Sequence, residues 1–295
     1  MTSVDARKDG TAAAPGRPVL SVPGVRQIVL LAGAVRPTTL MRAIGRSVLD
    51  LPLHDGRTVG QRWLDDVAEF AVAAGSADDG GGPSGRPPVR ILIDRDSPPP
   101  RSTAAGGVDV RADDVEFLGT GGVLQRAAQG CTGRMLIATG GSVLLRSLAS
   151  IAHELDRANA EVALLAERDG GPTGIMLVEC RVLAELRLVG YADFKEQCLP
   201  MIAERHAVRV VHSRERAALN IRDTERYLRC LRHLAGDGFA VVEEGASMDP
   251  TARLHEAVAL RGSRVEARAI VARSVLGRGG VGRGIMTDQT AWSES

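Results

Sequence analysis

The chain has 295 residues, enough for one large domain or for one domain with a smaller companion. Its 37 Lys and Arg residues nearly balance its 36 Asp and Glu residues, and aromatic residues make up only 3%, which argues against a nucleic-acid-binding protein. No apolar run is long enough to cross a bilayer, and the start, MTSVDARKDG, lacks the apolar core of a signal peptide, so we expect a cytoplasmic protein without membrane contact.

Short apolar runs alternate with amphipathic segments between residues 23 and 244. The first 22 residues are rich in Gly, Pro and Ala without periodicity, which predicts a disordered leader. The apolar runs predict strands over 27–33, 89–94, 135–139, 161–166, 174–178 and 207–211. The intervening segments predict helices after a capping box at Thr58–Gln61 and over 123–129, 143–159 and 224–234, with a flexible loop at 75–88. This alternation is typical of an α/β domain whose mostly parallel sheet is covered on both faces.

The pattern changes after residue 245. Apolar residues now recur at every sixth position, with slips between short series, at Met248, Leu254 and Leu260, at Val265 and Val271, and at Val275 and Val281. This hexapeptide spacing predicts a short left-handed β-helix over 245–286, followed by a tail at 287–295. About two coils cannot bury much surface alone, so we expect the segment to pack on the α/β domain or on a second subunit, in a homo-oligomer.

The four cysteines lie far apart in the sequence, at Cys131, Cys180, Cys198 and Cys230. Their spacing fits neither a zinc site nor a disulfide framework. We therefore predict buried free thiols in a reducing cytoplasm.

Six segments, in order, resemble motifs of the sugar-1-phosphate nucleotidyltransferases, also called NDP-sugar pyrophosphorylases, which include mannose-1-phosphate guanylyltransferases. They are IVLLAGAVRPTTL at 28–40, RSVLDLPL at 46–53, EFLGTGG at 116–122, the stretch 145–165, GYADFKEQCLP at 190–200 and NIRDTERYL at 220–228. The hexapeptide coils after a sheet domain are a further point of similarity. The resemblance implies a Rossmann-like, GT-A-like fold with a mostly parallel mixed sheet and a C-terminal left-handed β-helix. It also implies a reaction that joins a nucleoside triphosphate to a sugar 1-phosphate and releases pyrophosphate, with Mg²⁺ as cofactor.

The resemblance also implies positions for the site. The nucleotide loop would comprise Ala32, Gly33 and Ala34, and Arg36 and Arg46 would meet the phosphates. The turn that approaches the base would comprise Gly119, Thr120, Gly121 and Gly122. Gly174 and Glu196 would lie on the sugar side.

Two positions depart from the family pattern. The family holds its metal ion with two aspartates, and Gly141 and Asn220 stand at those positions here. Glycine offers no ligand and asparagine offers a neutral carbonyl oxygen, whereas Mg²⁺ favours anionic oxygens. We therefore expect a catalytically impaired protein that binds a nucleotide, a nucleotide sugar or a protein partner, or that acts as a regulatory subunit.

Three other interpretations remain open. An active enzyme could use a relocated Mg²⁺ site formed by Asp94, Asp96 or Asp223. A dinucleotide-binding turn at 119–122 lacks the acidic residue that should follow it. A hexapeptide-repeat acyltransferase would need more coils and a convincing catalytic histidine, although His255 lies within the coils. Asp193 and Glu196 also have the spacing of a helix-capping box.

Overall fold

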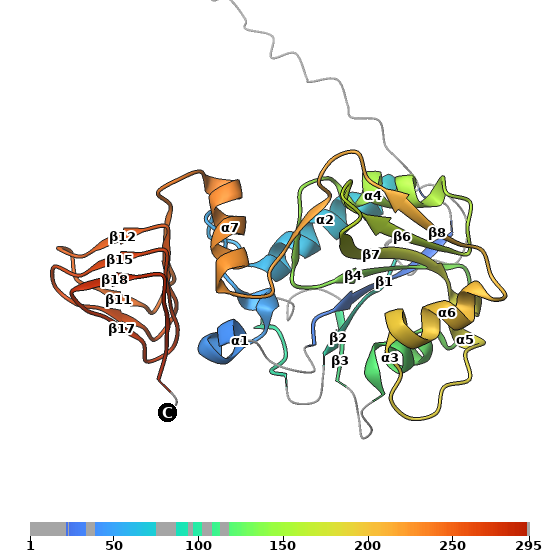
Figure 1. Ribbon diagram of the computed structural model, residues 1–295, viewed down its shortest axis with the longest axis horizontal. Helices are drawn as coiled ribbons and strands as arrows, with labels where there is room; N and C mark the ends of the chain where they lie inside the picture. Colours follow the sequence, from blue (N-terminus) through green and yellow to red (C-terminus); the bar gives the residue numbers. More distant parts are fainter. Residues whose placement is uncertain are drawn as a thin grey trace, which may run out of the picture.

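A computed structural model describes residues 22, 24–33, 39–74, 87–93, 97–101, 108–112 and 118–293. Its largest element is a seven-stranded sheet in the order β3-β2-β1-β4-β7-β6-β8 (Figure 1). Only β7 runs antiparallel to its neighbours, so the sheet is mixed and mostly parallel, as predicted. The strands are β1 (Val25–Leu31), β2 (Val89–Ile93), β3 (Val108–Ala112), β4 (Arg134–Thr139), β6 (Val162–Ala166), β7 (Pro172–Glu179) and β8 (Val208–His212).

Helices cover both faces of this sheet. In Figure 1, α2 and α4 lie on one side of the sheet, and α3, α5 and α6 lie on the other. Strand β1 shows why: Ile28 and Leu30 belong to one apolar core and Val29 belongs to the other, as the alternation of side chains along a strand requires. The helical segments are α1 (Thr39–Ile44), η1 (Val48–Asp50), α2 (Val59–Ala74), α3 (Gly119–Ala128), α4 (Leu148–Asp156), α5 (Cys180–Ala184), η3 (Phe194–Cys198), α6 (Leu199–Ala203) and α7 (Thr224–Ala235). None of the helices that the structure describes is long and apolar enough to span a membrane.

Helix α2 begins where the capping box predicts. The Thr58 backbone N–H donates to Gln61 Oε1 at 2.8 Å, and the Gln61 N–H donates back to Thr58 Oγ1 at 3.2 Å. Each side chain thus satisfies a backbone donor that the first helical turn leaves without a partner. Trp63 and Phe70, on the apolar face of α2, are each only 1% exposed.

The segment predicted as one helix over 143–159 is divided in the structure. Residues Ser142–Leu144 form the short strand β5, which pairs antiparallel with β9 (Ala218–Asn220). Helix α4 begins only at Leu148, where the Ser147 hydroxyl accepts from the Ser150 backbone N–H. The apolar spacing was compatible with a helix. However, residues at the start of the predicted helix pair instead with a strand more than 70 residues further along the chain. Strands β3 and β9 were not predicted, and the predicted leader and the loop at 75–88 fall almost wholly outside the described residues.

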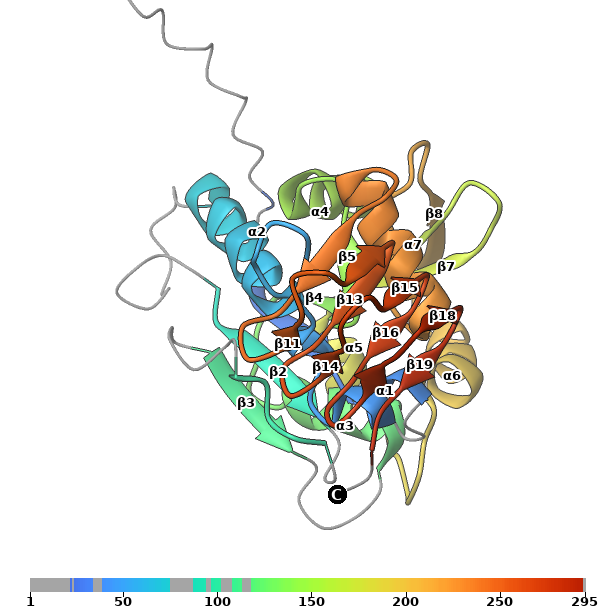
Figure 2. The ribbon, with the colours of Figure 1, turned by 90° about the vertical axis from the view of Figure 1, so that its left-hand side faces the viewer.

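The C-terminal strands form three small parallel sheets, which the chain visits in turn (Figure 2). Met248 pairs with Val265 and Leu254 pairs with Val271, so residues predicted from the six-residue spacing stack on one another. The arrangement is compatible with the predicted β-helix, and β10 and β19 extend it beyond 245–286. The sheets comprise β10 (Ala240–Val242), β13 (Ala257–Ala259), β16 (Val275–Leu276) and β19 (Thr290–Ala291); β11 (Ser247–Met248), β14 (Arg264–Val265) and β17 (Val281–Gly282); and β12 (Arg253–His255), β15 (Ile270–Ala272) and β18 (Ile285–Thr287).

The expectation of four free thiols is wrong for one pair. Cys131 and Cys180 are joined by a disulfide, with Cα atoms 5.8 Å apart, whereas Cys198 and Cys230 are free and buried. Cys131 precedes β4 and Cys180 follows β7, and the antiparallel pairing of these strands brings the two ends together. Spacing in the sequence carries no trace of this proximity.

Candidate functional site

The carboxyl ends of β1 and β4 lie side by side. The Gly140 N–H donates to the Leu31 carbonyl oxygen at 2.8 Å, which continues the pairing of the two strands past their ends. A Cβ atom at Gly140 would lie 3.1 Å from the Cβ of Ala32, so the two backbone segments are in close contact. In open α/β sheets, ligands bind outside the carboxyl ends of such neighbouring strands. We use the name strand-end site for Ala32, Gly33, residues 139–141, Gly174 and Asn220.

Helix α2 contacts the strand-end site through a hydrogen bond from Trp63. The buried indole of Trp63 donates from Nε1 to the Gly140 carbonyl oxygen at 3.1 Å. A buried carbonyl without a donor would be costly, so this bond stabilises the turn at 139–141 in one conformation. The sequence gives no sign that Trp63 contacts the site, because only the packing of α2 brings it to Gly140.

The two positions predicted to correspond to the family's aspartates, Gly141 and Asn220, meet in the structure. The Ile221 N–H donates to the Gly141 carbonyl oxygen at 2.6 Å, and Ser142 pairs with Asn220 across β5 and β9. The Ser142 hydroxyl also donates to Asn220 Oδ1 at 2.5 Å. A neutral hydroxyl–amide pair and a bare backbone therefore occupy this place. Ser142 was missed in the sequence, because only the β5–β9 pairing connects it with Asn220.

These groups do not fit a divalent cation. Mg²⁺ requires hard oxygen ligands and prefers carboxylates. The side chains at this place offer one amide oxygen, which already accepts a hydrogen bond, and one hydroxyl. Across the described parts of the chain, no three His, Cys, Asp or Glu side chains gather closely enough to hold a metal ion.

Gly174 lies against Thr139 at the same edge. It sits on β7 with φ of +79°, and an added Cβ would fall well inside contact distance of Thr139 Oγ1. The backbone conformation and the close approach both require glycine here. The structure thus brings the predicted sugar-side residue Gly174 next to Thr139.

The glycines of the 119–122 turn serve packing inside the protein. A Cβ at Gly119, whose φ is +67°, would lie 2.5 Å from the Ala192 carbonyl oxygen, and the Gly121 N–H donates to that oxygen at 2.8 Å. The Thr120 hydroxyl accepts from the Phe194 N–H at 3.0 Å. Close packing against residues 191–198 accounts for both glycines, and their contact with a nucleotide stays a prediction.

Arg46 is engaged elsewhere than predicted. Its guanidinium donates to both carboxylate oxygens of Glu243 at 2.6 Å each, and the two side chains are only 13% and 16% exposed. Burial tends to raise the pKa of Glu243, but Arg46 and the Arg261 N–H outweigh it and hold that pKa below its usual value. Arg46 therefore joins the α/β domain to the C-terminal strands through a carboxylate, and its contact with a phosphate stays a prediction.

Two predicted acidic residues cap helices. Asp223 Oδ1 accepts from the Arg226 N–H at 2.8 Å at the start of α7, which accounts for it without a metal ion. Asp193 Oδ1 accepts from the N–H groups of Lys195 and Glu196, as an N-cap residue does. The Asp193 N–H donates to Gln197 Oε1 at 2.7 Å, so the return bond of the predicted capping box comes from Gln197 and Glu196 is exposed on η3. The predicted residues Ala34, Arg36, Asp94 and Asp96 lie outside the described residues.

Comparison with known proteins gives similarity in structure alone. No protein-family model matches the sequence, and no curated protein sequence matches it. HddC from Yersinia pseudotuberculosis, solved in a complex with GMP-PN, superposes with a TM-score of 0.51 at 11% identity, over 71% of this chain and 100% of that chain. A putative glucose-1-phosphate thymidylyltransferase from Bacillus anthracis, solved with sucrose, superposes with a TM-score of 0.51 at 12% identity, over 72% of this chain and 96% of that chain.

At such low identity, these superpositions show the fold alone. The order of motifs in the sequence and the mixed seven-stranded sheet agree with them. The chain has a sugar-1-phosphate nucleotidyltransferase-like fold.

Proposed function

We propose that this chain is a catalytically impaired nucleotidyltransferase-like protein that binds a nucleotide or nucleotide sugar at the strand-end site and acts as a sensor or regulatory subunit. The observation that carries the proposal is the meeting of Gly141 with the Ser142–Asn220 pair, where the family reaction needs two carboxylates. Pyrophosphate release concentrates negative charge that a cation must offset. The neutral, hydrogen-bonded Ser142–Asn220 pair lacks the anionic ligands that would hold such a cation.

Binding can persist without the metal ion. The backbone at Ala32 and Gly33 follows a buried strand and lies beside Gly140. Gly33 is exposed, and glycine lets a ligand come close to the backbone. The complex of HddC with GMP-PN supports a nucleotide as the ligand class. In this proposal Gly119, Gly121 and Gly122 approach the base, and Gly174 and Glu196 lie on the sugar side.

The C-terminal strands have a structural role in the proposal. They form a left-handed β-helix that packs on the α/β domain through the Arg46–Glu243 pair and through the Thr224 and Thr290 hydroxyls, 2.6 Å apart. Exposed aliphatic side chains at Ile270 and Ile285 stack on this segment and would favour a homo-oligomer. A cytoplasmic location stays a prediction.

Catalysis is tested by pyrophosphate release. Purified protein is supplied with each nucleoside triphosphate and a panel of hexose 1-phosphates, in Mg²⁺ or Mn²⁺. The expected result is no release above the background without protein. Robust turnover would defeat the proposal, and its loss in Asp94→Ala or Asp96→Ala would establish instead an active enzyme with a relocated Mg²⁺ site. Strand β2, which precedes those residues, ends beside β1, and this favours that alternative over one at Asp223.

Binding is tested by thermal shift with UDP-, GDP- and ADP-sugars. A ligand that binds only the folded state raises stability in proportion to the logarithm of its concentration. Gly33→Glu should abolish the shift because it places a negative charge beside the phosphates. Thr132→Glu adds the same charge before β4, at the opposite edge of the sheet, and should leave the shift intact. Equal shifts in both variants would place the ligand elsewhere, and no shift with any ligand would contradict a binding role.

A further inference from the structure

A polar cavity lies between helix α2 and the segment that leads into α4. Its volume is about 610 Å³. One wall is a single face of α2 that carries Arg62, Asp66 and Glu69 at helical spacing. The opposite wall holds Arg146, and Glu215 lies between β8 and β9. We call this cavity the α2–α4 cleft; none of its lining residues belongs to the strand-end site.

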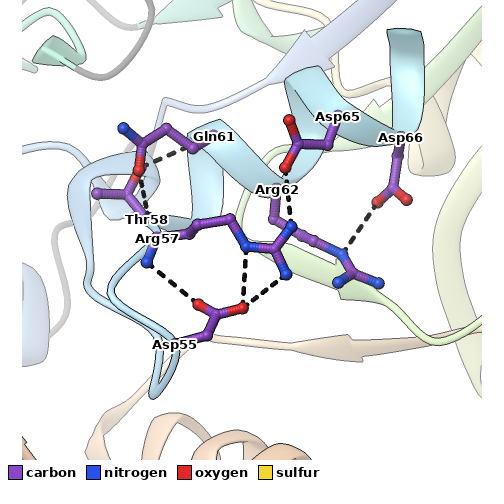
Figure 3. Close-up of polar contacts among 7 residues, drawn as sticks. All are labelled: Asp55, Arg57, Thr58, Gln61, Arg62, Asp65 and Asp66. Atoms are coloured by element: carbon purple, nitrogen blue, oxygen red, sulfur yellow. Dashed lines mark hydrogen bonds and ion pairs between the residues drawn. The ribbon is translucent and has the colours of Figure 1, made fainter. Parts of the chain in front are cut away.

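Two of the three arginines that line the α2–α4 cleft, Arg57 and Arg146, are already engaged by hydrogen bonds. Arg57 donates to Asp55 at 2.6 Å and to Asp65 at 2.8 Å, as Figure 3 shows. Arg146 donates to Glu154 and to the Ser213 hydroxyl, both at 2.7 Å. An anionic ligand would have to displace these internal partners. Apart from Arg62, which lies against Asp66, the charged side chains of the cleft that remain available to a ligand are therefore carboxylates.

Asp66 is the carboxylate with the most unused capacity. Its side chain is only 9% exposed, yet Oδ2 accepts no hydrogen bond from any described residue. Arg62 lies nearest, with Nε 3.7 Å from Oδ2, which is too far for a hydrogen bond, and that Nε also lacks an acceptor (Figure 3). A buried charge with an incomplete set of donors is costly. The chain retains it on a cavity wall, where a ligand can supply what the protein does not.

The net effect of burial and of the neighbouring charges also disfavours the ionised form of Asp66. Burial raises the pKa of Asp66 to about 6, against the smaller lowering effect of Arg62, and Glu69 raises it further. Glu69 and Glu215 have no ion-pair partner among the described residues. A carboxyl group whose pKa is raised by burial, as that of Asp66 is, is typical of functional sites. The groups that face Asp66 are Arg57, Arg62, Asp65 and Glu69 from α2 and the turn before it, Arg146 from the opposite wall, and Glu215.

We propose that the α2–α4 cleft binds a small organic cation that carries an ammonium or guanidinium group, which Asp66 receives with Glu69 and Glu215. The cation supplies the hydrogen-bond donors that Asp66 lacks and offsets the excess of carboxylates. This site is separate from nucleotide binding at the strand-end site and does not depend on it.

The test titrates full-length protein with agmatine and putrescine by calorimetry at pH 7.5 in amine-free buffer. 1,4-Butanediol is the neutral match of putrescine, and inorganic phosphate is the anion control. We expect saturable binding of the cations with one site per chain and no binding of the diol or phosphate. Asp66→Asn should weaken agmatine binding by about tenfold or more, because the charged acceptor is lost. Asp237→Asn, at a carboxylate that is 90% exposed, should leave it unchanged.

The pH dependence provides a second measure. Agmatine stays protonated between pH 5 and 7.5, whereas Asp66 does not stay ionised. One unit below a pKa of about 6, roughly nine-tenths of Asp66 is protonated, so wild-type affinity should fall about tenfold at pH 5. Asp66→Asn should lack this dependence. Equal binding by wild type and Asp66→Asn, absence of binding by both cations, or preferential binding of phosphate would each overturn the proposal.

Discussion

The strand-end site and the α2–α4 cleft differ in charge: the side chains of the first are neutral, whereas most of those that line the second are charged. The first lies where an α/β fold concentrates its chemistry, yet Gly141, Ser142 and Asn220 provide only neutral groups there. The second is lined by arginines and carboxylates, and its carboxylates outnumber its arginines. Position in the fold therefore does not establish activity, because the chemistry depends on the side chains that stand at that position.

The largest effect should come from introducing carboxylates at the two predicted metal positions. Gly141→Asp combined with Asn220→Asp should raise Mn²⁺ affinity by about two orders of magnitude, because two anionic ligands replace none. A Cβ at position 141 would lie 3.1 Å from the Ile221 carbonyl oxygen, so the aspartate fits after a small shift. Titration of Mn²⁺ by electron paramagnetic resonance measures the gain. Each single variant should gain less, and a double variant that binds like wild type would show that this edge no longer has a metal geometry.

The Arg46–Glu243 pair tests whether Arg46 is a structural residue. Glu243→Gln should lower the free energy of unfolding by about 2–4 kcal/mol, because it leaves a largely buried guanidinium without its counter-charge. Glu266→Gln makes the same change in an exposed pair with Arg283 and should cost less than about 1 kcal/mol. Urea denaturation compares them. If Glu243→Gln were neutral and strengthened nucleotide-sugar binding, Arg46 would be a phosphate ligand held in reserve.

Asp66→Asn should stabilise the protein at neutral pH. A pKa raised from 3.8 to about 6 means that ionisation of Asp66 opposes folding. The contribution of Asp66 to the free energy of unfolding is therefore fully present below pH 3.8 and is lost as the pH rises through 6. Above pH 7 the substitution should gain on the order of 2–3 kcal/mol, and near pH 4 the gain should vanish. Thermal unfolding across this range measures it. A gain that is independent of pH would contradict the role assigned to the charge.

The smallest effect concerns Trp63. Trp63→Phe removes the donor to the Gly140 carbonyl oxygen and should cost about 1–2 kcal/mol in unfolding experiments. Tyr227→Phe removes a buried hydroxyl that donates to the Pro52 carbonyl oxygen at 2.6 Å, so it should cost a similar amount. Only Trp63→Phe should also weaken nucleotide-sugar binding, because only Trp63 supports the turn at 139–141. Equal nucleotide-sugar binding by both variants would contradict a role for Trp63 in the strand-end site.

Local signals in the sequence determined much of the fold. Runs such as 89–93 form strands, and reciprocal hydrogen bonds at Thr58 and Gln61 start α2 where predicted, because both depend on neighbours within a few residues. The six-residue spacing also predicted the stacking of Met248 on Val265. The order of motifs identified the kind of fold, and the resemblance singled out Gly141 and Asn220 before any contact was known.

Contacts between distant segments were decided only by the tertiary structure. The β5–β9 ladder converted the first turn of a predicted helix into a strand and joined Ser142 to Asn220. The Cys131–Cys180 disulfide, the engagement of Arg46 by Glu243 and the cleft around Asp66 likewise join elements far apart in the chain. Periodicity reports which face of an element is buried but not what covers it. The partners of charged and polar groups therefore followed from packing, because a side chain's environment is set by all the elements that surround it.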